Sequence, residues 1–549
     1  MFRRPGMGYG TRRMLRRFTH LLLLPVLSGT LLVLSFPTYE LDFLAWIALA
    51  PLLIAIREKP WKTAFGQGWL AGLVFFVGTL SWVINAMHQY GKVPFPLSFL
   101  VMLLLAGYCA LFVALFAAIL VALPDPRGVL RPWTAAALWV TLEWLRGHLF
   151  SGFPWAMLGY SQYHALSVIQ MADVTGVYGV SFLLVVVNML AARVVDVIVS
   201  RVGLGANPVP MPWVTVPLAT VLVAVIVDYG YWRLDPRNNP ANEHSLRIGL
   251  IQPNIDQAQK WDVVFRREAI DRHKKLTNQV VREVDLVVWP EAATPFFFEV
   301  ETDYREELLR FVRDRGVPLL FGSPAMDSRT AGGPRLFNSA YLVSGGGVVL
   351  DRYDKVHLVP FGEYVPLKPI LFFLDKLVVG IGDFVPGSGP RVMSGPNGHL
   401  GLVICFEVIF PDLVRQFVDR GTDYMVTITN DAWFGRTSAP YQHFAMVVFR
   451  AVENRVPFAR AANTGISGFI DAEGHILRTT ELFVESALSG EVRLGGLRTF
   501  YTAYGDLFTL GCAILTLFVA GKMWWRPGTT RKEHVGRPKV TPVEVQYPF

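Results

Sequence analysis

The chain has 549 residues, of which 52% are hydrophobic and 17% are charged, below the roughly 25% of charged residues that soluble domains carry. Its formal charge of +8 is concentrated at the ends, because residues 1–17 hold six arginines and no acid, and residues 522–549 hold six basic and two acidic residues. Basic tails beside apolar segments are typical of membrane proteins. The composition excludes a small soluble domain. Because no basic surface interleaved with aromatic residues accompanies the charge, we expect no nucleic-acid partner.

Apolar segments of about 20 residues, the length that crosses a bilayer, recur through the first part of the chain. We predict a basic tail at 1–17, seven transmembrane helices within 18–235, an eighth at 504–524 and a second tail at 525–549. The seven helices are expected at about 18–36, 41–57, 64–87, 95–123, 133–150, 177–199 and 212–232.

The loops on one side of this predicted bundle carry most of its Lys and Arg residues, and the positive-inside rule assigns that side to the cytoplasm. Seven crossings then put the region 246–495 outside the cytoplasm, and the eighth returns the C-terminal tail to the inside. We therefore expect a multi-pass protein of a bacterial inner membrane with its large domain in the periplasm.

The region 246–495 alternates short β-rich segments with charged helical segments, which predicts an α/β domain. Strands are expected at 246–252, 285–290, 317–322, 338–343, 400–407 and 423–430, and helices at 262–283, 302–315 and 440–456. Because α/β folds commonly place their sites at the carboxyl ends of strands, residues that directly follow these strands are candidates for chemistry.

Three such residues are Glu291 in WPEAATP, Lys355 in DRYDKVHLVPFGEYVP and Cys405 in LVICFEVIFPD. Each alone has an ordinary explanation, as a solvated carboxylate, a surface charge or a core cysteine; Cys109 and Cys512 lie inside apolar segments and are expected in the core. Together the three supply what covalent acyl chemistry needs: a thiol, a base that takes its proton, and a cation that stabilises the oxyanion.

These segments resemble the carbon–nitrogen hydrolase (nitrilase) superfamily in their order and flanking residues, over roughly 246–495. The resemblance implies an αββα sandwich in which Glu291 is the general base, Lys355 stabilises the oxyanion and Cys405 is the nucleophile. NDAWFG (430–435) and RAVENRVPFARAANTG (450–465) resemble later motifs of that superfamily, which shape the pocket.

With the predicted helices included, nearly the whole chain resembles the apolipoprotein N-acyltransferase family. This implies that Cys405 takes the sn-1 acyl chain of a phospholipid, typically phosphatidylethanolamine, as a thioester. The chain then passes to the α-amino group of the S-diacylglyceryl cysteine of an apolipoprotein. No metal or cofactor is implied, and one polypeptide is expected to act as a monomer. The supporting residues implied are Trp261, Asn338, Glu363, Phe406, Glu407 and Trp433.

Two further features concern the membrane. The segment 366–387 has too few apolar residues to span a bilayer, and we predict a mobile arm whose Phe372 and Phe373 face lipid; a buried core helix is the alternative. FFF at 296–298 is predicted as a second lipid contact. Glu143 and Arg146, three residues apart on the fifth predicted helix, are expected to form a structural pair, with a substrate contact as the alternative.

Two other functions remain open at this point. A membrane-tethered amidase would use the same three residues, although a tether needs one helix rather than eight. A channel or transporter with an inactive external domain is disfavoured, because the predicted helices have few ionisable groups at their centres.

Overall fold

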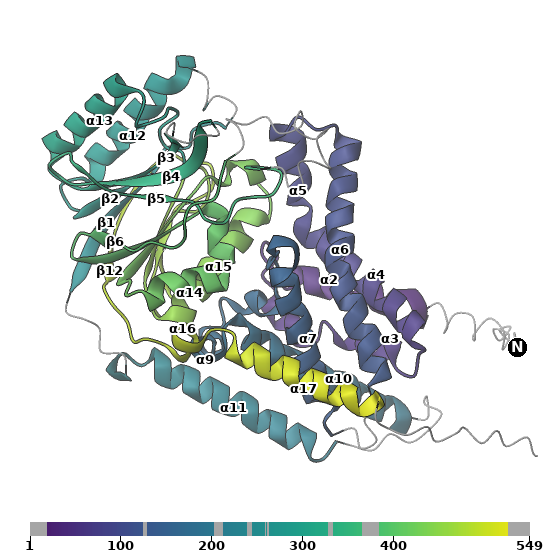
Figure 1. Cartoon of the computed structure of the whole chain (residues 1–549). Helices are drawn as coiled ribbons and strands as arrows, with labels where there is room; N and C mark the ends of the chain where they lie inside the picture. The colour runs from purple at the N-terminus through teal and green to yellow at the C-terminus, as the bar shows by residue number, and fades with distance from the viewer. Residues whose placement is uncertain are drawn as a thin grey trace, which may run out of the picture.

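The computed structural model describes residues 19–123, 129–202, 212–238, 244–257, 260, 263–327, 333–364 and 384–524. Two parts are visible in Figure 1. A helical part contains the first half of the chain and the last helix, and an α/β part contains the residues between them.

The helical part consists of apolar helices that pack along one another. Its main members are α2 (Leu24–Leu34), α3 (Ala50–Ile56), α4 (Trp61–Leu80), α6 (Phe95–Ala122), α7 (Arg131–His148), α10 (Val177–Arg201), α11 (Thr215–Leu234) and α17 (Leu507–Trp524). Among the described residues, α4, α6, α10 and α11 are long and apolar enough to cross a membrane. They match the third, fourth, sixth and seventh predicted helices.

The other predicted transmembrane helices are present in shorter or less apolar form. Shorter apolar helical segments cover 21–34, 42–56 and 507–521, and α7 lies where the fifth was expected. Four of the described helices are therefore long and apolar enough to cross a membrane, and the total of eight stays a prediction.

Small residues let α4 and α6 approach closely. A Cβ atom on Gly68 would lie 2.6 Å from the carbonyl oxygen of Val113, and one on Gly72 would lie 2.9 Å from the Cα atom of Ala110. Gly68 and Gly72 are four residues apart and therefore share one face of α4, as in other closely packed membrane helices. Gly66, on the same helix, has open space around it.

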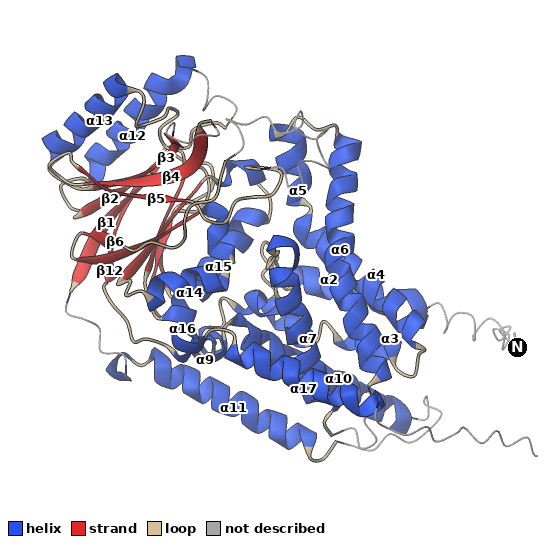
Figure 2. Ribbon diagram, viewed as in Figure 1, coloured by secondary structure: helices blue, strands red, loops and turns tan. Residues whose placement is uncertain are grey.

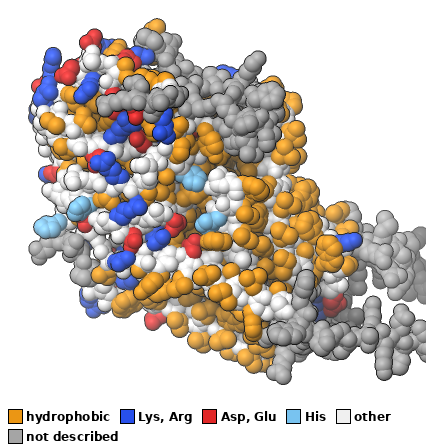
Figure 3. Space-filling view, viewed as in Figure 1, with side chains coloured by type: hydrophobic (Ala, Val, Ile, Leu, Met, Phe, Trp, Pro, Cys, Tyr) orange, Lys and Arg blue, Asp and Glu red, His pale blue; other side chains and the backbone are white. Residues whose placement is uncertain are grey.

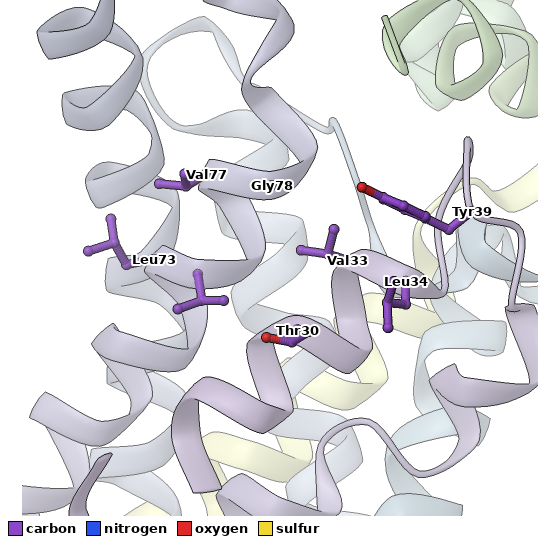
Figure 4. Close-up of a pocket in the computed structure, with 8 residues that line it drawn as sticks. Thr30, Val33, Leu34, Tyr39, Leu73, Val77 and Gly78 are labelled. Carbon is purple, nitrogen blue, oxygen red and sulfur yellow. The ribbon is translucent and has the colours of Figure 1, made fainter. Parts of the chain in front are cut away.

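A cavity of about 470 Å³ opens between α2 and α4. Its walls are mostly aliphatic (Figure 4). The lining residues are Thr30, Val33, Leu34, Tyr39, Leu73, Val74, Val77 and Gly78. An apolar cavity on the side of a helical bundle fits a hydrocarbon environment rather than a reaction centre.

The α/β part contains two six-stranded mixed sheets. The first has the order β12-β1-β2-β3-β4-β5, and the second has the order β11-β10-β9-β8-β7-β6. Strands of the first are β1 (Ser245–Gln252), β2 (Leu286–Val288), β3 (Leu319–Asp327), β4 (Arg335–Val343), β5 (Val349–Asp354) and β12 (Ser486–Arg493). Strands of the second are β6 (Met393–Gly395), β7 (Gly398–Ile404), β8 (Tyr424–Thr429), β9 (Phe458–Ala462), β10 (Gly468–Ile470) and β11 (Ile476–Thr479).

The two sheets lie face to face between two pairs of helices (Figure 2). The helices α12 (Arg266–Val280) and α13 (Thr302–Arg315) cover the first sheet, and α14 (Pro411–Asp419) and α15 (Ala439–Asn454) cover the second. At the centre of each sheet are parallel strands, β1-β2-β3 and β7-β8-β9. The predicted α/β sandwich is thus confirmed.

Buried ion pairs join α15 to the helical part. Arg450 contacts Glu453 at 3.1 Å, and the Glu453 carboxylate accepts a hydrogen bond from the backbone N–H of Val177 at the start of α10. Arg455 pairs with Asp173 at 2.8 Å. In Figure 3 hydrophobic side chains gather over the helical part, whereas charged ones lie over the α/β part. The Val177–Glu453 hydrogen bond and the Arg455–Asp173 ion pair therefore fix the α/β domain to the helical part.

Replacing Gly72 with Leu is expected to destabilise the protein by about 1–3 kcal/mol, because the new side chain must push α6 away. Thermal unfolding in detergent measures this as a lower midpoint temperature. Gly66→Leu is the matched control, since the same change points into open space and should leave the midpoint within error. Equal midpoints for the two variants would contradict the packing described for α4 and α6.

Candidate active site

The three predicted reactive residues meet at the ends of strands from both sheets. Glu291 follows β2, Lys355 follows β5 and Cys405 follows β7. All three are buried, with exposed fractions of 7%, 1% and 8%. Residues separated by up to 114 positions in the sequence therefore form one buried cluster.

Cys405 begins a short 3₁₀ turn (Cys405–Ile409) directly after β7. Its φ angle is +53°, a conformation that few residues other than glycine adopt. Its carbonyl oxygen lies 3.2 Å from Nε2 of His443 on α15. A sharp strand-to-helix turn of this kind lifts a nucleophile out of the sheet and is often found at active sites.

Glu291 is held at both carboxylate oxygens. Oε1 accepts a hydrogen bond from Asn338 at 2.8 Å, and Oε2 accepts one from the backbone N–H of Asn430 at 2.9 Å. Gly322 allows this placement, because a Cβ atom there would lie 2.8 Å from the Cα atom of Glu291. The carboxylate is thus fixed in position at the end of β2.

Lys355 pairs more closely with Glu363 than with Glu291. Its Nζ lies 2.9 Å from Oε1 of Glu363 and 3.6 Å from Oε1 of Glu291. Asn338 donates through the same Nδ2 to Glu363 at 2.7 Å and to Glu291 at 2.8 Å, so it bridges the two carboxylates. The backbone N–H of Val359 satisfies the other oxygen of Glu363.

Electrostatics keep the thiol protonated and the lysine charged. Burial raises the pKa of the Cys405 thiol, and the nearby charge of Glu291 raises it further, while the Lys355 charge acts in the opposite direction. For Lys355, burial alone would lower the pKa, but the Glu363 and Glu291 carboxylates outweigh it and raise the pKa. The resting site is therefore a neutral thiol beside a carboxylate and an ammonium.

Glu407 has a structural role within the cluster. Its carboxylate accepts hydrogen bonds from Ile404 at 2.7 Å, Val356 at 2.6 Å and Tyr353 at 2.8 Å. Burial raises its pKa to about 7 against the effect of these donors. Glu407 thus ties the end of β7, which carries Cys405, to the segment that carries Lys355.

Phe406 and Trp433 contribute aromatic surface. The Phe406 ring packs edge-on against Phe410, with ring centroids 5.4 Å apart. Trp433 is 37% exposed, and its ring lies against Tyr90 of the helical part at a centroid distance of 5.5 Å. Asn85, from the segment after α4, donates to the carbonyl oxygen of Trp433. Trp433, three residues after Asn430, therefore contacts the helical part.

A buried network of His443, Asp431 and Arg460 contacts the turn at Cys405. Asp431 lies 3.2 Å from His443 Nδ1 and 2.7 Å from Arg460. Burial and the Arg460 guanidinium lower the pKa of His443. Asp431 belongs to the motif NDAWFG and Arg460 to RAVENRVPFARAANTG, and the predicted role of these motifs in shaping the pocket stays a prediction.

Sequence reasoning missed several members of the site. Lys260 donates through Nζ to the carbonyl oxygen of Glu291 at 3.0 Å, and Gln257 accepts a hydrogen bond from the Asn430 side chain at 2.5 Å. His443 was also missed. Each is an isolated polar residue in a loop or helix, and no spacing pattern marks it. Only the motif NDAWFG pointed toward Asn430.

The remaining predictions fall elsewhere. Trp261, Phe372 and Phe373 lie outside the described residues. The role of Trp261 and the lipid-facing arm with Phe372 and Phe373 therefore stay predictions. The prediction for FFF was wrong for Phe296 and Phe298, which are buried in the core of the α/β domain at 2% and 1% exposure. The sequence of a short aromatic segment does not indicate whether its side chains face lipid or the core of the domain.

Glu143 and Arg146 are both buried and hold the loop that follows α7. Arg146 donates to the carbonyl oxygens of Phe153 and Trp155, at 2.9 and 2.6 Å, and the backbone N–H of Leu158 donates to Glu143 at 2.8 Å. Both side chains therefore have structural partners in the loop backbone, and the predicted ion pair between Glu143 and Arg146, which both lie in the described part of the chain, is not formed.

Comparisons with known proteins match both parts of the chain. Residues 28–190 match the family model for the apolipoprotein N-acyltransferase N-terminal domain, and residues 247–501 match that for carbon-nitrogen hydrolase. Among solved structures, an amidase from Nesterenkonia sp. is 24% identical with a TM-score of 0.35, over 48% of this chain and 95% of the amidase.

Curated relatives match over nearly the full length. The apolipoprotein N-acyltransferase of Geobacter metallireducens is 45% identical over 91% of this chain and 94% of its own. That of Chlorobaculum tepidum is 33% identical over 89% of this chain and 94% of its own. The chain therefore belongs to the apolipoprotein N-acyltransferase family, and its α/β domain is a carbon–nitrogen hydrolase domain.

Proposed function

We propose that this protein N-acylates lipoproteins, using Cys405, Glu291 and Lys355 in a two-step transfer through a covalent acyl-enzyme. The observation that carries the mechanism is the buried cluster in which a strained cysteine turn meets a carboxylate held at both oxygens and an ammonium. Family membership supports the overall reaction, and the geometry supports the role of each residue.

In the first step Cys405 attacks the sn-1 ester carbonyl of a phospholipid. Because burial raises the pKa of the thiol, Glu291 takes the thiol proton as the carbon–sulfur bond forms. Lys355 stabilises the negative charge on the tetrahedral oxygen. The ester carbon–oxygen bond then breaks, the leaving alkoxide takes the proton from Glu291, and a lysophospholipid departs from the thioester.

In the second step the α-amino group of a diacylglyceryl cysteine attacks the thioester carbonyl. Glu291 takes a proton from the attacking amine and passes it to the sulfur of Cys405 as the carbon–sulfur bond breaks, which restores the thiol. An amide forms in place of the thioester. Because the donor leaves before the acceptor reacts, the steady-state kinetics are of the ping-pong type.

Both substrates carry acyl chains, so the site must be reached from the membrane. The contacts of Trp433 with Tyr90 and Asn85 put the exposed edge of the site beside the helical part. We place the helical part in the inner membrane and the α/β domain in the periplasm, where lipoprotein precursors are exposed. Phosphatidylethanolamine is the proposed donor, the segment 366–387 the proposed lipid-facing arm, and a single chain the proposed active unit.

Incubation of the purified protein with phosphatidylethanolamine is expected to leave one acyl chain on Cys405, detected by mass spectrometry of the intact protein and of its peptides. Cys405→Ala should form no adduct. Cys109→Ala, at a cysteine buried in α6, is the matched control and should acylate normally. An adduct on the Cys405→Ala protein, or none on the wild type, would refute the proposed mechanism.

Glu291→Gln is expected to slow acyl-enzyme formation roughly 10²–10⁴-fold, because the amide keeps the size of the side chain but cannot take a proton. Rapid quenching followed by mass spectrometry gives the rate. Glu283→Gln, at an exposed carboxylate of the same domain, should keep the wild-type rate. A wild-type rate for Glu291→Gln would assign the base to another residue.

A further inference from the structure

Lys260 is a buried lysine beside the active site that the two steps above do not use. Its exposed fraction is 2%, and its Nζ donates to the backbone carbonyl oxygen of Glu291 at 3.0 Å. Within the described part of the chain, no carboxylate forms an ion pair with it. A buried ammonium that has only a carbonyl partner costs free energy, so its place in the site requires a compensating role.

The charges of the cluster show what that role is. Lys355 and Glu363 form the closest pair, at 2.9 Å, and together they are neutral. The negative charge of Glu291 remains, with Lys355 farther away at 3.6 Å. Glu407 is engaged separately by the backbone of β7 and of the segment after β5. Besides Lys355, a second cation beside Glu291 would bring this cluster closer to neutrality.

The negative charge moves during the reaction. It lies on the Glu291 carboxylate at rest, passes to the sulfur of Cys405 when the proton is transferred, and reaches the carbonyl oxygen of the substrate in the tetrahedral state. A fixed positive charge near all three positions stabilises each of them without rearrangement.

Lys260 lies within electrostatic range of the first two positions. Burial lowers its pKa to about 8, and the charges of Glu291 and Cys405 act in the opposite direction. On α12, His273 also faces Lys260; burial lowers the pKa of this imidazole to about 3, so it is neutral and adds no competing charge. The Lys260 ammonium is thus a cation, in addition to Lys355, whose charge acts on both Glu291 and Cys405.

Lys260 also braces the backbone of the catalytic carboxylate. Ala292, the next residue, has a φ angle of +48°, so the chain turns sharply after Glu291. The Lys260 ammonium holds the carbonyl oxygen at this turn, and Gln257, three residues earlier, holds the side chain of Asn430, whose N–H binds Glu291. One short segment therefore supports Glu291 from two directions.

We propose that Lys260 is a positioning residue that fixes the turn of Glu291 and supplies the positive charge that balances the negative charge as it moves from Glu291 to Cys405 and on to the substrate. This inference rests on the proposed function, in which Glu291 takes the thiol proton. It predicts that the charge of Lys260, beyond its hydrogen bond, makes the Cys405 thiolate accessible.

The test is the pH dependence of Cys405 alkylation by iodoacetamide in the purified full-length protein, followed at that cysteine by peptide mass spectrometry. Lys260→Gln keeps a hydrogen-bond donor for the Glu291 carbonyl but removes the charge, and Lys260→Arg keeps the charge. We expect Lys260→Gln to slow alkylation about tenfold at neutral pH, below the Lys260 pKa of about 8, and to approach the wild-type rate at alkaline pH, where Lys260 itself loses its charge. Lys260→Arg should remain near the wild type.

Lys275→Met is the matched control, because Lys275 lies on α12 with a side chain 71% exposed and contacts Glu485. It should titrate as the wild type does. Thermal unfolding of every variant checks that the fold is intact; if Lys260→Gln is unfolded, Lys260→Met replaces it in the same comparison. A wild-type alkylation rate at neutral pH in a folded, uncharged variant would overturn the inference.

The experiment separates this inference from the proposed function. If the wild type forms no acyl adduct with phospholipid, the proposed function fails, whatever the alkylation rates are. If the adduct forms and the uncharged variant is alkylated at the wild-type rate at neutral pH, only the role of Lys260 fails.

Discussion

The site depends on keeping several ionisable groups together and away from water. Removing an ion from water costs several kcal/mol unless partners replace the lost hydration. Here Asn338 donates to Glu291 and to Glu363, and Lys355 lies between the same two carboxylates. Burial raises the pKa of the Cys405 thiol. In the proposed mechanism the thiol therefore stays neutral until it attacks the substrate and gives its proton to Glu291.

The two-sheet architecture provides these partners. Strand ends from both sheets bring the reactive groups to one place, and Glu407 links the strand before Cys405 to the segment of Lys355. The network of Asp431, His443 and Arg460 holds the turn at Cys405 through the contact of His443 with its carbonyl oxygen. Farther along α15, Arg450 and Glu453 connect the same helix to the helical part. The helix α15 therefore contacts both the turn at Cys405 and the helical part of the molecule.

Much of this could be predicted from the sequence, for physical reasons. The predicted strands at 246–252 and 423–430 became β1 and β8, because buried parallel strands have continuous apolar runs. Short or exposed strands such as β11 have no such pattern and were missed. Glu291, Lys355 and Cys405 were recognised together, whereas Lys260 was not, since its partner is a backbone carbonyl and no residue spacing records that contact. The direction of the Phe296 side chain depends on packing between elements that are distant in the sequence, so the residues around Phe296 could not predict it.

The central claim is that the acyl group rests on Cys405 between two separate encounters. The most direct measurement isolates the protein after reaction with labelled phospholipid, removes the lipid, and then adds a diacylglyceryl-cysteine peptide. The account predicts that the label leaves Cys405 and appears as an amide on the peptide amine at the same rate. Retention of the label on Cys405, or transfer that occurs only when phospholipid is also present, would contradict it.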